Sequence, residues 1–278
     1  MANQKKFLNS KEISASLDEI IKRNNLHLEL KGLTRDTRDL ISAIINGLLE
    51  RIGADPLSSF HLFSGLMEAL LNAIKGNIRY TIFKNELANK LRDVENSEKE
   101  IDRLLQIILG TSALRDAMQR YVVPEKIKKL VQSILSLEDK VRVKKQNISE
   151  EDKELLFSIR EKMKIENRKI SMKIRLDEIE LYFRIKNDSP IMEGDMDRIN
   201  ESREKHYQLF LEGRSSDYFR PEFLDEKESA GFGIAMIDEG FYNMGLNPLE
   251  YFTYTQAKTT TTVYMIYPLD KLRAGAFG

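Results

Sequence analysis

The stretch ISMKIRLDEIELYFRIKN, residues 170–187, changes the period of the sequence from helical to extended. Apolar residues alternate with polar ones over 170–176 and again over 179–185, so one side of each segment is apolar. The acidic pair Asp177-Glu178 lies between the two segments, which is typical of a tight turn. The stretch therefore predicts a β-hairpin with one buried face and one polar face.

Three more segments have the pattern or composition of strands. Residues 26–30 alternate with period two before the hairpin. Residues 251–255 and 261–267 follow it and are rich in β-branched and aromatic side chains. We therefore expect a sheet of at least five strands.

Helical periodicity fills much of the remaining sequence. Apolar stripes run through residues 40–52 and 56–91, and a glycine-flanked apolar run covers 231–244. Five strands packed on three helices predict the α+β class, as a two-layer sandwich.

The order of these segments divides the chain into parts. Residues 1–24 are expected to hold an N-terminal helix, and 25–91 the first part of the sandwich. Residues 92–168 are highly charged, with short apolar patches at helical spacing, and predict an inserted helical subdomain. The second part of the sandwich is expected over 169–278, with a polar segment, 192–229, inside it.

Composition excludes several classes of protein. The 278 residues include no cysteine and only three histidines, which excludes disulfides and thiolate sites and disfavours a histidine-rich zinc site. Lys+Arg and Asp+Glu are both 44, so the total charge gives no reason to expect a nucleic-acid partner. We find no run of about 20 apolar residues and no leader sequence, so we expect no membrane contact and a cytoplasmic location.

The first motif is EALLNAIK, residues 68–75. On a helix, Glu68, Asn72 and Lys75 share one face at the edge of the apolar stripe. Carboxylate and amide oxygens suit Mg²⁺, and an ammonium group neutralises phosphate. Taken alone, such spacing is more often a solvated helix surface.

The second motif is NDSP, residues 187–190, directly after the hairpin. A short polar side chain at the end of a strand, such as Asn187 or Asp188, can hydrogen-bond the exocyclic amine of a purine. An ordinary turn of the Asn-Asp-Ser-Pro kind is the alternative.

The third motif is GFGIAMI, residues 231–237, where two glycines lead into an apolar helix. Amides at a helix N-terminus bind phosphate, and glycine allows close approach to the backbone. A tight turn before a core helix is the alternative. The motif is not a dinucleotide-binding fingerprint, because no strand precedes it and the third glycine is absent.

Together, the three motifs resemble the ATP-binding domain of the histidine-kinase-like ATPase superfamily, the Bergerat fold. EALLNAIK resembles the asparagine box of that family, and NDSP occupies the place of its first glycine box. GFGIAMI is similar to the second glycine box, and TTVYMIYPL, residues 261–269, to the closing strand. The resemblance covers roughly residues 25–90 and 168–270, and implies a mixed sheet on three helices with a lid over 192–229.

The resemblance implies ATP and Mg²⁺ as ligands. Asn72 would coordinate the Mg²⁺, Glu68 would be the general base, and Lys75 would approach a phosphate. Gly231 and Gly233 would provide amides beside the phosphates. These roles come from the resemblance and not from spacing alone.

Adenine would be recognised by Asn187 or Asp188, with support from Thr261 or Thr262. The first glycine box departs from the family pattern, because it lacks a glycine and its aspartate is replaced by Asn187 or shifted to Asp188. The helical insert makes the gap from Asn72 to the first box longer than is usual in the family. In the lid, Lys205, Arg214 and Arg220 are candidate phosphate contacts.

Three functions stay open on the sequence. The first is an ATP-binding signalling protein, a serine/threonine kinase or ATPase closest to the anti-sigma-factor serine kinases and acting on a partner protein. The second is a degenerate member that serves as an adaptor through its helical insert. The third is an unrelated α+β interaction protein. We also expect a homodimer formed by helices.

A phospho-accepting histidine is not expected in this chain. His27 lies in a predicted strand and His206 in the predicted lid, and His61 begins a helix without flanking residues of the acceptor type. Each is expected to be structural.

Overall fold

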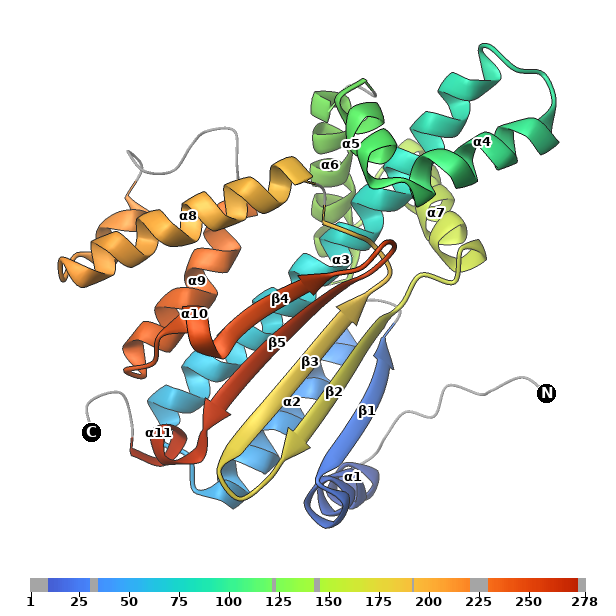
Figure 1. Ribbon diagram of the computed structural model, residues 1–278. Helices are drawn as coiled ribbons and strands as arrows, with labels where there is room; N and C mark the ends of the chain where they lie inside the picture. The colour runs from blue at the N-terminus through green and yellow to red at the C-terminus, as the bar shows by residue number, and fades with distance from the viewer. Residues whose placement is uncertain are drawn as a thin grey trace.

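The computed structural model describes residues 10–30, 35–121, 124–142, 146–191, 193–220 and 230–274. The chain is an α+β sandwich, with one sheet backed by helices and a group of helices at one end of it (Figure 1). The five strands are β1 (Asn25–Leu30), β2 (Ile170–Leu176), β3 (Glu180–Asn187), β4 (Phe252–Gln256) and β5 (Thr261–Pro268).

The α-helices are numbered along the chain. They are α1 (Ser10–Arg23), α2 (Arg35–Ile52), α3 (Pro56–Arg92), α4 (Glu98–Gly110), α5 (Ser112–Tyr121), α6 (Pro124–Arg142), α7 (Glu150–Ile165), α8 (Glu193–Leu211), α9 (Ala230–Asn243), α10 (Pro248–Tyr251) and α11 (Leu269–Ala274). A short 3-10 helix, η1 (Ser215–Phe219), follows α8.

The sheet has the strand order β1-β2-β3-β5-β4, and each neighbouring pair is antiparallel. The prediction of a mixed sheet is therefore wrong, because the sheet is antiparallel throughout. Each of the five predicted strands is confirmed, with shifts of one or two residues at their ends.

The hairpin of β2 and β3 is built as its sequence predicts. Asp177 directly follows β2, and its side chain accepts hydrogen bonds from the amides of Ile179 and Glu180 at 3.1 and 2.9 Å. Phe183 and Ile185 are buried against the helices, while Arg184 and Lys186 point to the other face. Alternation thus separates an apolar face from a polar face.

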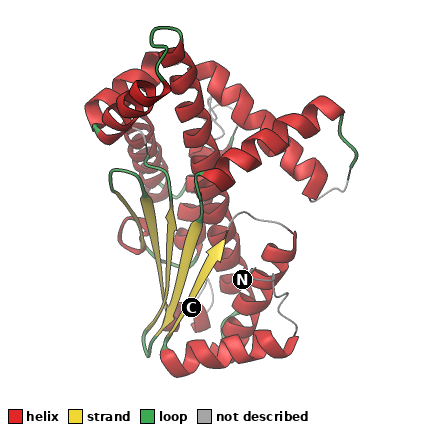
Figure 2. Cartoon of the chain, turned by 90° about the vertical axis from the view of Figure 1, so that its right-hand side faces the viewer, coloured by secondary structure: helices red, strands yellow, loops and turns green. Residues whose placement is uncertain are grey.

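The main core lies between the sheet and helices α2, α3 and α9, with α1 at its edge. Its fully buried side chains include Ile44 and Leu48 of α2, Leu66 of α3, and Phe183 of β3. In Figure 2 long helices lie beside the sheet, and further helices lie at its upper end.

Helix α3 takes part in two separate cores. Its first half packs in the main core, whereas Ile78, Ile82 and Phe83 of its second half pack with α4, α6 and α7 in a second core. Within the described residues, α3 is also the one helix long and apolar enough to cross a membrane. That finding is weak, because a buried core helix passes the same test.

A polar junction connects the helical group, helices α4–α7, to the sheet. Glu166, which follows α7, accepts hydrogen bonds from Lys84 of α3 at 2.7 Å and from Arg168 at 2.8 Å. The guanidinium of Arg168 also lies 4.7 Å from the centre of the Tyr80 ring. Burial alone would raise the pKa of Glu166, but Lys84 and Arg168 outweigh it and hold the pKa below the usual 4.5.

The Glu166 junction predicts an acid-sensitive contribution to stability. A carboxyl whose pKa is lowered by folding stabilises the protein above its unfolded-state pKa and loses that contribution as the pH falls. We expect Glu166→Gln to lower the free energy of unfolding by about 1–2 kcal/mol at pH 7. In urea unfolding, the difference from wild type should shrink below pH 4.5. A difference that is equal at pH 7 and pH 3.5 would refute the ion-pair role.

The two faces of β3 predict opposite tolerance to truncation. Phe183 is fully buried and Lys186 is exposed on the other face. We expect Phe183→Ala to cost about 3–5 kcal/mol in urea unfolding and Lys186→Ala to change stability by less than about 0.5 kcal/mol. Similar costs for both variants would contradict the assignment of the faces.

Candidate functional site

Helix α3 presents the first motif on the side turned toward α9 and the tip of β3. The N-terminus of the helix is stabilised, because the Asp55 side chain caps it and Pro56 occupies its first turn. Glu68 is mostly buried, and its carboxylate lies 3.7 Å from the ammonium of Lys75, which is 37% exposed. Asn72 lies between them in sequence and is half-buried.

The start of α9 packs directly on Glu68. Gly233 is buried in the first turn of α9, and a methyl carbon built on it would lie 2.8 Å from the carboxyl carbon of Glu68. Glycine disfavours helices by about 1 kcal/mol relative to alanine, so its presence here has a packing reason. The carboxylate of Glu68 occupies the space that a side chain would fill. Gly231 lies in the same turn.

The tip of β3 reaches α3 two turns further along. A methyl carbon on Gly76 would lie 2.9 Å from the Ser189 hydroxyl and 3.2 Å from the Asn187 amide nitrogen. Asn187 is buried, and its amide donates to the Ser189 hydroxyl at 2.5 Å and to the Ser189 carbonyl at 3.3 Å. Its third acceptor is the Asn77 side chain, at 3.4 Å.

Thr261 completes this buried polar cluster from β5. It is the register partner of Asn187, and its hydroxyl donates to the Ser189 carbonyl at 2.7 Å. Asn187, Ser189, Asn77 and Thr261 are all at most 6% exposed. Buried polar groups need such partners, so this cluster fixes the position of the strand tip.

Two predicted residues are not brought into this cluster. Thr262 follows Thr261 and therefore faces the opposite side of the sheet, level with Lys186. Asp188 turns toward β2, where its carboxylate accepts from the Lys169 amide at 3.0 Å and its carbonyl accepts from Arg168. Asn187, rather than Asp188, faces α3.

Two residues of the cluster, Ser189 and Asn77, and the neighbouring Gly76 are not among the predicted site residues. Gly76 lies at i+4 from Asn72 and i+8 from Glu68, so the helical period contained a signal for it. Ser189 lies within the second motif, in which only Asn187 and Asp188 are predicted to contact a ligand. Asn77 carried no signal, because its role depends on the tip of β3, 110 positions away.

The first part of the predicted lid is a helix packed on α9. Arg203 of α8 forms two hydrogen bonds of 2.9 Å with Asp238 of α9, and both side chains are buried. Arg214 and Arg220 both pair with Asp217 at 2.8 Å. These contacts engage two of the three candidate phosphate ligands of the lid. The rest of the predicted lid, residues 192 and 221–229, lies outside the described residues.

His206 of α8 lies beside this ion pair. It is fully buried, surrounded by the rings of Tyr218, Phe219 and Tyr242, and Nε2 lies 3.0 Å from a carboxylate oxygen of Glu239. A buried imidazole cannot reach a phosphoryl donor in solution, which agrees with a structural role.

The three motifs meet along one stretch of α3. Gly233 lies at Glu68 and the strand tip lies at Gly76, and eight residues of helix correspond to about 12 Å. Along this span lie the Glu68 carboxylate, the Lys75 ammonium and the Asn187 amide. The backbone at Gly233 and Gly76 carries no side chain. Such a set suits a ligand with phosphates at one end and a hydrogen-bonding base at the other.

The described residues contain no group of three or more metal-ligating side chains. A Mg²⁺ ion bound beside phosphates usually takes one or two protein oxygens and completes its shell with water and phosphate oxygens. Asn72 is half-buried and lies one turn along α3 from Glu68, so it offers an amide oxygen of this kind.

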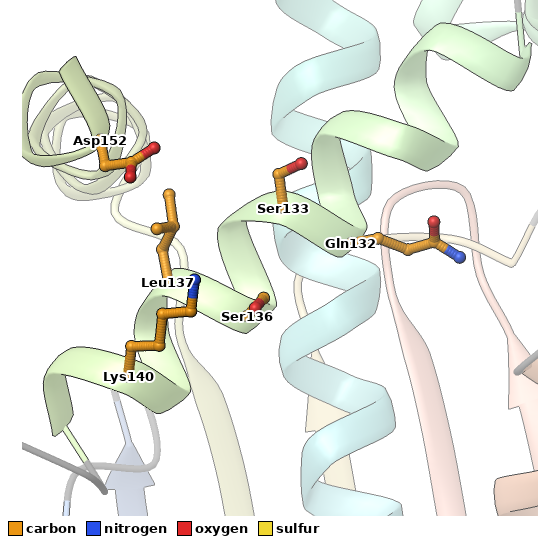
Figure 3. Close-up of a pocket in the computed structure, with 6 residues that line it drawn as sticks. All are labelled: Gln132, Ser133, Ser136, Leu137, Lys140 and Asp152. Carbon is orange, nitrogen blue, oxygen red and sulfur yellow. The ribbon is translucent and has the colours of Figure 1, made fainter. Parts of the chain in front are cut away.

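A separate open pocket of about 360 Å³ lies between α6 and α7 (Figure 3). Its lining consists of Gln132, Ser133, Ser136, Leu137, Lys140 and Asp152. None of these residues belongs to the three motifs.

Comparison with known proteins adds no assignment. No protein-family model, no curated protein and no solved structure matches the chain. Any functional assignment therefore depends on the residues themselves.

The contact between Glu68 and Gly233 predicts an energetic coupling. Gly233→Ala should lower the free energy of unfolding by about 1–3 kcal/mol, because the new methyl group displaces Glu68. In a Glu68→Ala background the same change should be neutral or stabilising, because alanine favours helix. Urea unfolding of the four proteins gives the coupling.

Gly240→Ala on the same helix is the matched control. A methyl carbon there would lie 3.5 Å from its nearest neighbour, the carbonyl of His61, which is an ordinary contact. It should cost little in either background. An equal cost of Gly233→Ala with and without Glu68 would contradict the contact.

Proposed function

We propose that the chain binds Mg²⁺-ATP along α3, as a signalling protein of the histidine-kinase-like ATPase type. One observation carries this proposal. Motifs that are 119 and 165 positions apart from Glu68 in the sequence, at Asn187 and Gly233, pack on the same 12 Å of helix, by a rise of about 1.5 Å per residue. The element order is compatible with the resemblance, because a strand and two helices come before helices α4–α7, and a hairpin, α8, a glycine-led helix and a second hairpin come after them.

The proposed roles of individual residues come from the resemblance and are compatible with their positions. Asn72 would hold the Mg²⁺ that neutralises phosphate charge, and Lys75 is exposed enough to leave Glu68 and reach a phosphate. Glu68, seated against Gly233, would accept the proton of an attacking hydroxyl or water. The acceptor decides between a protein serine/threonine kinase and an ATPase.

The base would lie at the buried cluster. Within the described part of the chain, the Asn187 side chain forms its hydrogen bonds through its nitrogen, so its oxygen remains as an acceptor. An acceptor at this position suits the exocyclic amine of adenine, and Thr261 lies directly opposite on β5.

A second candidate function has its own observation. Ser189 stands where the family has glycine, and its hydroxyl binds Asn187 and contacts Gly76. Because the polar groups of this cluster already bond one another, the cluster can fill the place of the adenine instead of binding it. In that case the protein is an adaptor that binds a partner through helices α4–α7.

Binding of Mg²⁺-ATP tests the proposal directly. We expect micromolar affinity by titration calorimetry, and stabilisation of about 2.7 kcal/mol at a hundred times the dissociation constant. Asn72→Ala should weaken binding at least tenfold. Asn89→Ala, an exposed position on the same helix, is the matched control and should bind normally.

The two candidate functions give different results. Absence of binding up to millimolar Mg²⁺-ATP, with no thermal shift, would reject the ATP site and leave the adaptor. Ser189→Gly then identifies the cause, since a variant that gains ATP affinity would show that the hydroxyl closes an otherwise intact site.

A further inference from the structure

The face of the sheet opposite the helices is uncovered within the described residues. Figure 1 views this face from the front, with α2 and α3 behind the strands. The strand register places its outward side chains in rows across the sheet. The central row, from β1 to β4, consists of His27, Lys173, Arg184, Tyr264 and Thr253.

Positive charge dominates this face. Lys173, Arg184 and Lys186 form no ion pair with any described residue. The carboxylates nearby are already used, because Glu29 pairs with Lys169 at 2.8 Å and Glu180 with Arg175 at 2.5 Å. The total charge of the chain is zero and therefore does not indicate this local concentration of positive charge.

The arrangement of these cations has a cost. Lys173 and Arg184 are direct cross-strand partners, and like charges in that position destabilise a sheet. The Nε of Arg184 is buried and lacks a hydrogen-bond acceptor. An anionic ligand on this face would offset the repulsion between Lys173 and Arg184.

Aromatic rings lie among the cations. Tyr182 and Tyr264 project from the neighbouring strands β3 and β5, with ring centres 6.1 Å apart. The guanidinium of Arg175 lies 4.8 Å from the centre of the Tyr182 ring. Both tyrosines are half-buried, so part of each ring is accessible.

We infer that this face binds single-stranded nucleic acid. Phosphates would pair with Lys173, Arg184 and Lys186, and unpaired bases would stack on the tyrosines and on Arg175. A second copy of the chain is a poor occupant, because two positive faces repel. An acidic peptide would match the charge but would leave the tyrosines without a role, and a duplex hides its bases. The proposed ATP site lies on the other side of the sheet, so neither proposal depends on the other.

The test is fluorescence anisotropy of the full chain with labelled 12-nucleotide oligouridylate and oligothymidylate at 50 to 200 mM salt. We expect binding that weakens with salt. The double variant Lys173→Gln/Arg184→Gln should bind at least tenfold more weakly, with a slope of log affinity against log salt reduced by about 1.4, since each lost contact on a single strand contributes about 0.7. Tyr264→Leu should weaken binding without changing the slope.

Controls separate this surface from general charge. Lys129→Gln/Lys140→Gln removes two exposed cations from α6 and should bind normally. Urea unfolding of the sheet double variant should show unchanged or higher stability, because it removes a like-charge pair. Mg²⁺-ATP affinity should be the same in both double variants.

Several results would overturn the inference. They are absence of oligonucleotide binding at 100 μM protein and 50 mM salt, an equal loss in the α6 control, and equal affinity for a duplex of the same length. Binding of an acidic 12-residue peptide that depends on Lys173 and Arg184, without oligonucleotide binding, would assign the face to a protein partner instead.

Discussion

The sharing of helix α3 between two cores is the constraint on which the rest of the structure depends. Its first half is held by the sheet and α9, and its second half by the helical group. Residues 68–77, which carry the candidate site, lie where one core gives way to the other. A rigid helix, continuous over 37 residues, therefore fixes the strand tip, the start of α9 and the insert relative to one another.

This arrangement connects helices α4–α7 directly to the candidate site. Arg168, at the exit from α7, binds both Glu166 and the Asp188 carbonyl, next to Asn187. Asn77 links the same regions, because its amide donates to the Lys169 carbonyl at 3.2 Å and its oxygen accepts from Asn187. A few polar contacts thus connect the end of α7 to the strand tip.

The sequence alone predicts much of the architecture, because it depends on local periodicity. The alternation of residues 170–185 fixes the hairpin and its two faces, and the spacing of Glu68, Asn72 and Lys75 places them together on α3. The glycine pair before an apolar run correctly marks the start of α9. In each case the pattern lies within one or two elements.

Features that depend on distant pairing could not be predicted in this way. Antiparallel pairing of every neighbouring strand is a property of the whole sheet, and only the β3–β5 register shows that Thr261 faces Asn187 while Thr262 faces away. The turn of Asp188 toward Lys169 and the role of Asn77 likewise depend on long-range contacts. The basic face is similar, since it arises only when separate strands align.

Amide hydrogen exchange with and without Mg²⁺-ATP tests the central claim most directly. If the nucleotide lies along α3, added protection will concentrate in three separate segments, around 68–77, 187–189 and 230–235, and the outer strand β1 will not change. Protection confined to the helical group, or none at saturating nucleotide, would contradict the convergence of the three motifs on one ligand.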